Sequence, residues 1–476
     1  MKKNLLQTPF SSVKTMYFSG IGGIGMSGLA ELFLNLGYSI QGSDIKESPT
    51  IERLRSLGIK IFIGQDKENI KEADILVVSS AIKENNEEYK EAVLLGIPIF
   101  KRSKMLAELM RFKWSIAVAG THGKTTTTSL ISHVMHYAKL DPTAVIGGIV
   151  NSWGQNSRIG ESNWIVAESD ESDGSFLDLP ATISVVTNIE EEHMEHYGTY
   201  DKLKSDFVRF IKNIPFVGFS VLCLDNEGVQ DIVPLIRQRK IITYGLSLQA
   251  DYRVTNIDYT SSGTSFDIET NIKGVERIRK SFFLPMFGEH NVLNATAAIV
   301  VAENIGIEEN IIRDSLKDFS GVKRRFTNIG VLKDIVFIDD YAHHPSEIEA
   351  VINAGFQLKK EDSKILAIVQ PHRYTRVRDH FEAFCKCFNK ADFVIVLDIY
   401  KAGEEPIDGF EAENLVEGIQ NYGHKNVSYL KEKELVEKIA DLKESNKIEM
   451  ALFMGAGDIT TIAQKVFNKM SKQDKS

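Results

Sequence analysis

The segment Ser115-Ile116-Ala117-Val118-Ala119-Gly120-Thr121-His122-Gly123-Lys124-Thr125-Thr126 decides the fold of the middle of this chain. Its first five residues are small or apolar and predict a buried strand, and the apolar residues that follow the segment recur at helical spacing. A strand that enters a helix through Gly-Lys-Thr is typical of a phosphate-binding P-loop. Backbone N–H groups cradle the phosphates, the lysine reaches the outer phosphate oxygens and the threonine hydroxyl binds Mg²⁺. The full motif requires glycine at position 118, where this chain has Val118.

Two acidic clusters follow other predicted strands in the same region. The strand 164–167 runs into Glu168-Ser169-Asp170-Glu171-Ser172-Asp173, and the strand 183–186 is followed by Glu190-Glu191-Glu192-His193. Parallel sheets place their ligand crevices at the carboxyl ends of strands, where oxygen and imidazole ligands for a metal are then available. Acidic runs are also common in solvated loops, so each member of the clusters stays a candidate ligand.

A second glycine loop lies near the N-terminus. The strand 15–19 leads into Gly20-Ile21-Gly22-Gly23-Ile24-Gly25, which satisfies G-x-G-x-x-G, and an apolar helix follows as far as Gly37. The next predicted strand, 38–41, is followed by Asp44, where a ribose-binding acid stands in dinucleotide folds. This arrangement predicts a diphosphate site at the helix N-terminus, without distinguishing NAD from another ribose-diphosphate ligand.

Alternation of strands and helices predicts an α/β fold with parallel sheets. The pattern restarts near residues 15, 114 and 335, which predicts three domains at 1–112, 113–322 and 323–476. The first and third are expected to be Rossmann-like, and the second to be P-loop ATPase-like. Residues 250–283 read as antiparallel hairpins added to the second domain. Residues 468–476 read as a solvated tail.

Length and composition limit the class of protein. The 476 residues correspond to about three average domains. The net charge of -9 argues against a generic electrostatic hold on nucleic acid or an anionic membrane. The three cysteines provide no disulfide framework, and no apolar run approaches the length of a membrane span. We therefore expect a cytoplasmic protein without nucleic-acid or membrane partners.

Cationic and histidine residues follow two strands of the third domain. Gln370-Pro371-His372-Arg373-Tyr374-Thr375-Arg376 offers cations that suit a carboxylate or an acyl phosphate, although the same residues would also fit a basic surface turn. His343 and His344 follow another strand and could orient phosphate or accept a proton, or one of them could simply pack at a helix start.

Taken together, these blocks resemble the Mur ligase family, the ATP-dependent amide-forming enzymes of bacterial peptidoglycan assembly. The resemblance covers nearly the whole chain and is strongest to the branch that adds L-alanine to UDP-N-acetylmuramate. Besides the two loops and the acidic clusters, it is carried by residues 194–198, 288–295, 321–326, 339–345, 370–376 and 455–458.

The resemblance implies a site for each substrate. Gly22, Gly23 and Gly25 would face the diphosphate of the UDP-sugar, and Asp44 would bind a ribose hydroxyl. Magnesium would be held by Thr125, Glu168 and His193, with Glu168 favoured over Glu171 because it follows the strand directly. Lys202 and Lys204 are not assigned the carbamylated-lysine role found elsewhere in the family. ATP is assigned to Gly120, Thr121, His122, Gly123, Lys124, Thr125, Thr126, His290, Asn291, Asn294, Arg325 and Asp340, and L-alanine or its acyl-phosphate partner to His372, Arg373 and Arg376.

The implied reaction forms an acyl phosphate from ATP and then an amide, with Lys124, Glu168, His193 and His344 as catalytic residues. The base that deprotonates the amine stays open between His193 and His344, and a monomer or weak homodimer is expected. Three other readings remain: a recycling ligase that attaches a tripeptide, an NAD-dependent oxidoreductase, and a nucleotide-gated binding module. The oxidoreductase hypothesis leaves the P-loop at residues 120–126 and its two acidic clusters unexplained.

Overall fold

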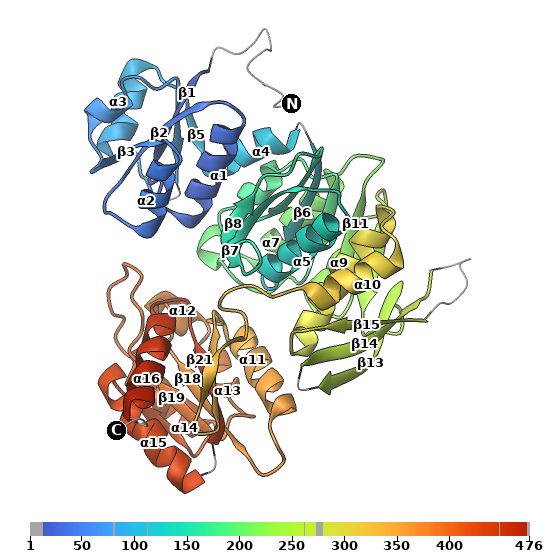
Figure 1. The fold of residues 1–476 in the computed structure, drawn as a ribbon, viewed down its shortest axis with the longest axis vertical. Coiled ribbons are helices and arrows are strands. Elements are labelled where there is room, and N and C mark those ends of the chain that lie inside the picture. Colours follow the sequence, from blue (N-terminus) through green and yellow to red (C-terminus); the bar gives the residue numbers. More distant parts are fainter. Residues whose placement is uncertain are drawn as a thin grey trace. The chain divides into compact units, whose positions relative to one another are not determined.

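The computed structural model describes residues 13–79, 81–111, 113–260, 262–272, 279–446 and 448–473. Three sheets with flanking helices confirm the predicted three-part α/β architecture (Figure 1). The chain divides into two compact units. The first holds Met1–Thr255, Ile268–Lys280 and Leu293–Ser320, and the second holds Asn256–Asp267, Ser281–Val292 and Gly321–Ser476. The domain boundaries at residues 113 and 323 stay a prediction.

The N-terminal sheet is a five-stranded parallel sheet in the order β3-β2-β1-β4-β5. Its central strand β1 is buried on both faces, as expected for an apolar strand covered by helices. This order confirms the Rossmann-like prediction. The elements are β1 (Thr15–Ser19), α1 (Ile24–Asn35), β2 (Ser39–Asp44), α2 (Pro49–Ser56), β3 (Lys60–Ile63), η2 (Lys67–Ile70), β4 (Ile75–Val78), α3 (Glu87–Leu95), β5 (Ile99–Lys101) and α4 (Arg102–Arg111).

The central sheet has ten strands in the order β15-β14-β13-β12-β11-β10-β6-β9-β7-β8. The P-loop strand β6 pairs in parallel with β9 and β10, so the two acidic clusters follow the strands on either side of it. The elements are β6 (Trp114–Ala119), α5 (Lys124–Tyr137), β7 (Thr143–Val150), β8 (Gln155–Arg158), β9 (Trp164–Glu168), η3 (Ser175–Asp178), β10 (Ile183–Val186), α6 (Met194–Tyr197), α7 (Tyr200–Lys212), β11 (Phe219–Cys223), α8 (Glu227–Ile232), η4 (Val233–Leu235), β12 (Ile241–Gly245), β13 (Tyr252–Thr260), β14 (Gly263–Thr270), β15 (Arg279–Leu284), α9 (Glu289–Asn304) and α10 (Glu309–Asp318).

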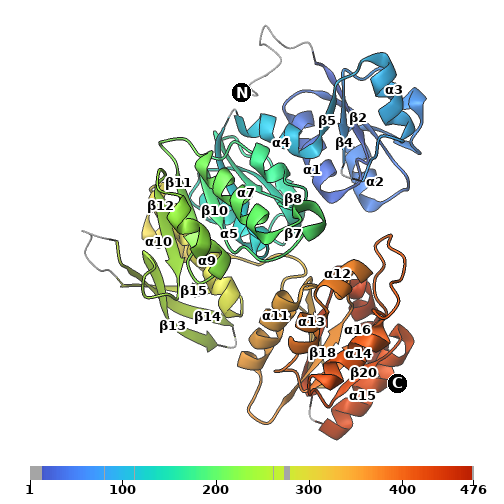
Figure 2. The same cartoon turned by 180° about the vertical axis from the view of Figure 1, so that it is seen from behind.

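The C-terminal sheet has the order β16-β17-β21-β18-β19-β20. It is parallel except for β16, which pairs antiparallel with β17 and was not predicted. Helices α11 to α14 contribute to one apolar core and α15 and α16 to another, so both faces of the sheet are covered (Figure 2). The elements are β16 (Thr327–Leu332), β17 (Ile335–Asp340), α11 (Pro345–Leu358), β18 (Lys364–Val369), α12 (Tyr374–Asp379), α13 (Phe381–Lys386), β19 (Phe393–Val396), α14 (Ala412–Asn421), β20 (Val427–Tyr429), η5 (Glu432–Glu434), α15 (Leu435–Asn446), β21 (Ile448–Met454) and α16 (Ile459–Gln473).

The prediction of a solvated tail over 468–476 is wrong for its first part. Helix α16 continues to Gln473 and buries Met470 at 3% exposure, because the apolar side of this helix is needed to cover the sheet. Residues 474–476 lie outside the described part of the chain.

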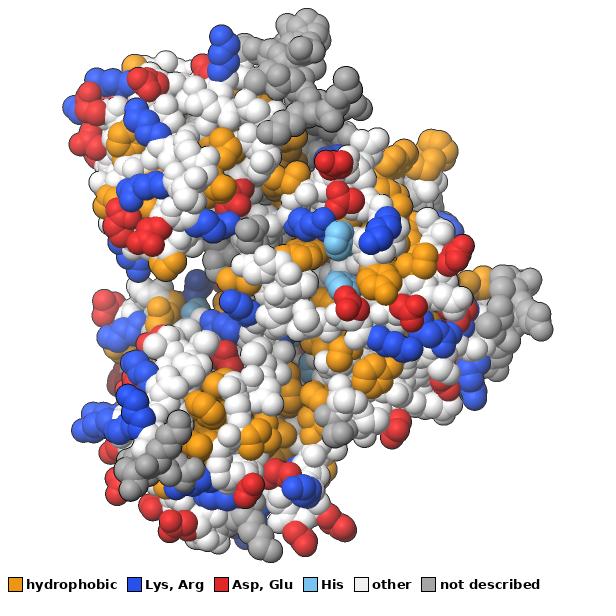
Figure 3. Space-filling model, viewed as in Figure 1, with side chains coloured by type: hydrophobic (Ala, Val, Ile, Leu, Met, Phe, Trp, Pro, Cys, Tyr) orange, Lys and Arg blue, Asp and Glu red, His pale blue; other side chains and the backbone are white. Residues whose placement is uncertain are grey.

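The distribution of charge, the length of the helices and the state of the cysteines bear on the sequence predictions. Acidic and basic side chains are intermixed over the described residues of the face in Figure 3. None of the helices described is both long enough and apolar enough to cross a membrane. The three cysteines are buried and unpaired with one another.

Candidate active site

The P-loop forms the turn between β6 and α5. Gly120 and Gly123 both have positive φ angles, of +132° and +82°, which glycine adopts without strain. Gly123 is the N-cap of α5 and has no side chain to satisfy the first amides of the helix. These amides and the positive end of the helix dipole are the features that bind phosphate in P-loops.

Lys124 is held within the loop by buried acceptors. Its Nζ donates to the carbonyl oxygens of Gly120 at 2.6 Å and Thr121 at 3.0 Å, and pairs with Glu171 at 2.9 Å. Burial alone would lower the pKa of Lys124, but Glu171, Asp170 and Glu168 together raise the pKa above its ordinary value. The raised pKa keeps Lys124 positively charged at neutral pH.

In the acidic cluster at the end of β9, Glu168 contacts Thr125 and Glu171 contacts Lys124. Glu168 accepts a hydrogen bond from the Thr125 hydroxyl at 3.1 Å and another from the Gly147 amide at 2.7 Å. Glu171 is 2% exposed, and burial raises its pKa while Lys124 opposes that shift. The structure thus places Glu168 beside the predicted metal-binding hydroxyl and Glu171 beside the phosphate-binding lysine.

The cluster after β10 approaches the cluster after β9. Ligand atoms of Glu171, Glu192 and His193 all lie within 4.8 Å of one another. His193 has a positive φ of 59°, and its ring nitrogens lie 3.9 Å from Glu192 and 3.6 Å from Glu195. Two carboxylates with one imidazole are a donor set that fits a divalent cation.

Two residues after β10 hold the P-loop backbone in place. The Asn188 side chain accepts from the His122 amide at 2.7 Å and donates to the His122 carbonyl at 3.1 Å. The Thr187 hydroxyl donates to the same carbonyl. Sequence analysis did not single out Thr187 and Asn188, because their role depends on contacts across the sheet.

Asn294 also reaches the P-loop. Its Oδ1 accepts from the Thr127 hydroxyl at 3.0 Å, and the same oxygen occupies the space that a side chain at Gly123 would need. The other two ATP-binding candidates from residues 288–295, His290 and Asn291, belong to the second compact unit. Burial, together with Arg325, lowers the pKa of His290 to about 4, so its ring is neutral at pH 7.

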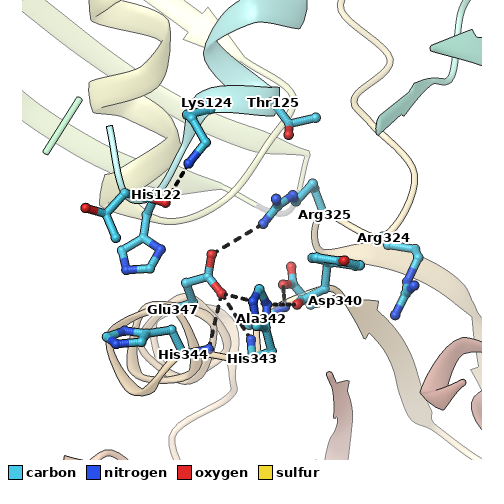
Figure 4. Close-up of polar contacts among 12 residues, drawn as sticks. His122, Lys124, Thr125, Arg324, Arg325, Asp340, Ala342, His343, His344 and Glu347 are labelled. Atoms are coloured by element: carbon cyan, nitrogen blue, oxygen red, sulfur yellow. Dashed lines mark hydrogen bonds and ion pairs between the residues drawn. The ribbon is translucent and has the colours of Figure 1, made fainter. Parts of the chain in front are cut away.

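In the second unit, Arg325 and Asp340 belong to one polar cluster (Figure 4). Asp340 accepts from the amides of Phe326 at 2.6 Å and Ala342 at 2.7 Å. Burial raises the pKa of Asp340 to about 6 despite the nearby Arg325 guanidinium. Arg325 lies 4.0 Å from Glu347, whose carboxylate also accepts from the amides of His343 and His344 at the start of α11.

The predicted carboxylate-binding residues form the turn from β18 to α12. Arg373 has a positive φ of 70° and donates its amide to the Tyr400 carbonyl at 2.9 Å. The His372 ring stacks on Tyr400 with centroids 5.5 Å apart and lies 3.4 Å from the Arg376 guanidinium. Burial, then His343 and the two arginines, lower the pKa of His372 to about 4. At neutral pH the positive charge of this turn therefore comes from Arg373 and Arg376.

A cavity of about 580 Å³ lies at the carboxyl ends of β18 and β19 in the same unit. Its wall includes Gln370, Asp398, Tyr400 and Asp458, so Tyr400 borders both the cavity and the His372 turn. His344 lies elsewhere in this unit, with Nδ1 2.8 Å from the Ser346 hydroxyl and its ring edge-on to His380.

The N-terminal glycine loop is closed by the predicted acid. The Asp44 carboxylate accepts from the Gly22 amide at 2.8 Å, and a side chain at Gly22 would collide with it. Gly23 is the N-cap of α1 and has no side-chain cap. Gly25 lies against the guanidinium of Arg102, a residue that the sequence did not single out.

Comparison with known proteins assigns the chain to a family. The catalytic domain model of the Mur ligase family matches residues 15–114, the Mur ligase middle domain model matches 118–302, and the Mur ligase glutamate ligase domain model matches 324–457.

Individual relatives cover nearly the whole chain. A UDP-N-acetylmuramate–L-alanine ligase from Rhodospirillum rubrum is 49% identical over 96% of this chain and 94% of its own length, and one from Maricaulis maris is 48% identical over 95% and 96%. The crystal structure of UDP-N-acetylmuramate-alanine ligase from Thermotoga maritima aligns with a TM-score of 0.79 and 28% identity, covering 97% of this chain and all of that one. The order of its sheets, its two glycine loops and these full-length similarities place the chain in the Mur ligase family.

Proposed function

We propose that this protein is an ATP-dependent ligase that joins L-alanine to the lactyl carboxylate of UDP-N-acetylmuramate in peptidoglycan synthesis. The products are UDP-N-acetylmuramoyl-L-alanine, ADP and phosphate. The observation that carries the proposal is full-length similarity to L-alanine ligases in a chain whose P-loop lysine, Lys124, lies among the carboxylates of two strand ends. Its cytoplasmic location and its state as a monomer or weak homodimer stay predictions.

Each substrate is assigned to a described group of residues. The UDP-sugar would bind Gly22, Gly23, Gly25 and Asp44, where the backbone approaches the diphosphate and the helix N-terminus favours its charge. L-Alanine would present its carboxylate to Arg373 and Arg376, with neutral His372 as a hydrogen-bonding neighbour. ATP would bind Gly120, Thr121, His122, Gly123, Lys124, Thr125, Thr126, His290, Asn291, Asn294, Arg325 and Asp340.

Magnesium fits the donors at the two strand ends. Thr125, Glu168 and His193 would hold it. The hydrogen bond from Thr125 and the engagement of Glu171 by Lys124 support Glu168, whereas His193 has its ligand atoms within 4.8 Å of those of Glu171 and Glu192. When bound, the metal neutralises phosphate charge during transfer.

The lactyl carboxylate needs activation because its negative charge repels a nucleophile at carbon. A carboxylate oxygen attacks the γ-phosphorus of ATP, the bond to ADP breaks, and an acyl phosphate forms. Lys124 stabilises the charge that develops on the phosphoryl oxygens, so the enzyme contributes positioning and electrostatics rather than a covalent intermediate. During this step the Lys124 ammonium group must either break its ion pair with Glu171 or interact with Glu171 and the phosphate at the same time.

Amide formation follows when the amine nitrogen of L-alanine attacks the acyl carbon and the phosphate leaves. A base must take a proton from the ammonium group before the attack. His193 and His344 are the candidates, and metal coordination would remove His193 from that role because its ring nitrogen would then be engaged.

The test is phosphate release from Mg-ATP and UDP-N-acetylmuramate with L-alanine or the tripeptide as the amine, and with product masses measured. We expect release with L-alanine and a mass gain of one alanine residue. Release only with the tripeptide would assign the chain to the recycling branch, and no release with either amine would refute the ligase proposal. Lys124→Met serves as the control for contaminating ATPase activity.

A further inference from the structure

A buried carboxylate lies beneath the N-terminal glycine loop. Glu88, in the first turn of α3, is fully buried, and its carboxylate accepts four hydrogen bonds. The donors are the hydroxyls of Tyr17 at 2.7 Å, Ser19 at 2.6 Å and Ser43 at 2.8 Å, and the Asn69 amide at 3.3 Å. They come from β1, β2 and η2, so the Glu88 side chain joins α3 to two strands of the N-terminal sheet and to η2. Figure 1 labels β1, β2 and α3.

The chemistry of this network requires a carboxylate. An ionised carboxylate is acceptor-only and offers about four lone-pair positions, which the four donors fill. A glutamine side chain would keep only one acceptor oxygen and would bring two donors to face hydroxyl groups. Every donor is neutral, so hydrogen bonds alone hold the carboxylate oxygens. Glu88 itself is fixed in the first turn of α3, where Asn86 caps its amide at 2.9 Å.

Ser19 directly precedes the glycine loop, which begins at Gly20, and Ser43 directly precedes the acid that closes it, Asp44. The Ser43 carbonyl accepts the amides of Gly20 and Ile21, each at 2.9 Å, and Asp44 accepts the Gly22 amide. A shift of Ser43 would therefore move both the start of the loop and the carboxylate that closes it.

We propose that Glu88 is a positioning residue for UDP-sugar binding: through Ser19 and Ser43 it fixes the glycine loop and Asp44 in the geometry that accepts the diphosphate and ribose. The inference rests on the proposed function, since the ligand of this loop is the UDP-sugar. Glu88 touches no substrate in this scheme, and its effect on the reaction passes through UDP-sugar affinity alone.

The test compares Glu88→Gln with Glu31→Gln. Glu31 is a second buried carboxylate of the same domain, but it pairs with Arg53 at 2.6 Å and makes no hydrogen bond to the described side chains of the loop. We expect Glu88→Gln to raise the Kd and KM for UDP-N-acetylmuramate about tenfold, a loss of about 1.4 kcal/mol in binding. The KM for ATP and kcat at saturating UDP-sugar should stay within about twofold of wild type. Glu31→Gln should lower the melting temperature without changing the Kd.

A double-mutant cycle with Ser43→Ala tests the path of the effect. If Glu88 acts through Ser43, the loss of binding free energy in the double variant will be smaller than the sum of the losses in the two single variants. Wild-type affinity in folded Glu88→Gln, or an equal loss of affinity in Glu31→Gln, would overturn the positioning role. If the wild-type protein itself fails to bind UDP-N-acetylmuramate, the proposed function fails, and that result is separate because it precedes any comparison of variants.

Discussion

Lys124 has two roles that experiments can separate: it stabilises the phosphoryl charge in catalysis, and it pairs with buried Glu171 in the fold. In Lys124→Met the phosphoryl charge loses its cation, so we expect kcat to fall at least about 100-fold. The same change leaves Glu171 buried at 2% exposure without its partner, which should cost about 3 kcal/mol or more of unfolding free energy. Adding Glu171→Gln removes the unpaired charge and should recover most of the stability but none of the activity. Denaturant unfolding and phosphate-release rates measure the two quantities, and recovery of both together would contradict the separation.

His372 should give the protein a defined dependence of stability on pH. Its folded-state pKa of about 4 lies below the ordinary 6.5, so the unfolded chain binds the proton first. Stability from this group is complete above pH 6.5 and is lost as the pH falls toward 4, by about 3 kcal/mol at most. His372→Gln lacks the titration, so the stability of wild type relative to the variant should decline over that window. A difference that is constant from pH 7 to 4 would contradict the buried, neutral imidazole.

At the scale of elements, the strand–loop–helix of β1 and α1 contains glycines needed for different reasons. An alanine Cβ at Gly22 would lie 2.7 Å from an Asp44 oxygen and 3.1 Å from Ile51, so Gly22→Ala should destabilise the domain by about 1 to 3 kcal/mol. At Gly23 the nearest atom would be 3.5 Å away and the backbone suits alanine, so stability should change little. If Gly23 faces the diphosphate, Gly23→Ala should still weaken UDP-N-acetylmuramate binding. Calorimetry for stability and binding separates the two, and full affinity in Gly23→Ala would remove that residue from the site.

The elements that sequence predicts well are those encoded by local pattern. Both glycine loops join an apolar strand to a periodic helix within a few residues, and both were predicted in place. The Glu88 network was not predicted because its partners lie 19 to 71 residues away and no local pattern connects them. Strand β16 was missed for another reason: its two-residue turn to β17 uses Lys333 and Asp334 at positive φ, without the glycine or asparagine that usually signals such a hairpin.

At the scale of the whole molecule, the two compact units should respond differently to the UDP-sugar. All of its proposed contacts, Gly22, Gly23, Gly25 and Asp44, belong to the first unit. Ligand at 100 times Kd stabilises the unit that binds it by about 2.7 kcal/mol. Hydrogen exchange followed by mass spectrometry should therefore slow by about 100-fold in globally protected amides of β1 and β2, while amides of β18 and β21 in the second unit keep their rates. Gly23→Ala provides the matched control, because weakened binding should remove the protection from β1 without unfolding it. Equal protection of β18 would contradict this prediction. It would show that UDP-sugar binding is coupled to the second unit, so that contacts in the first unit alone do not account for the affinity of the protein for the UDP-sugar.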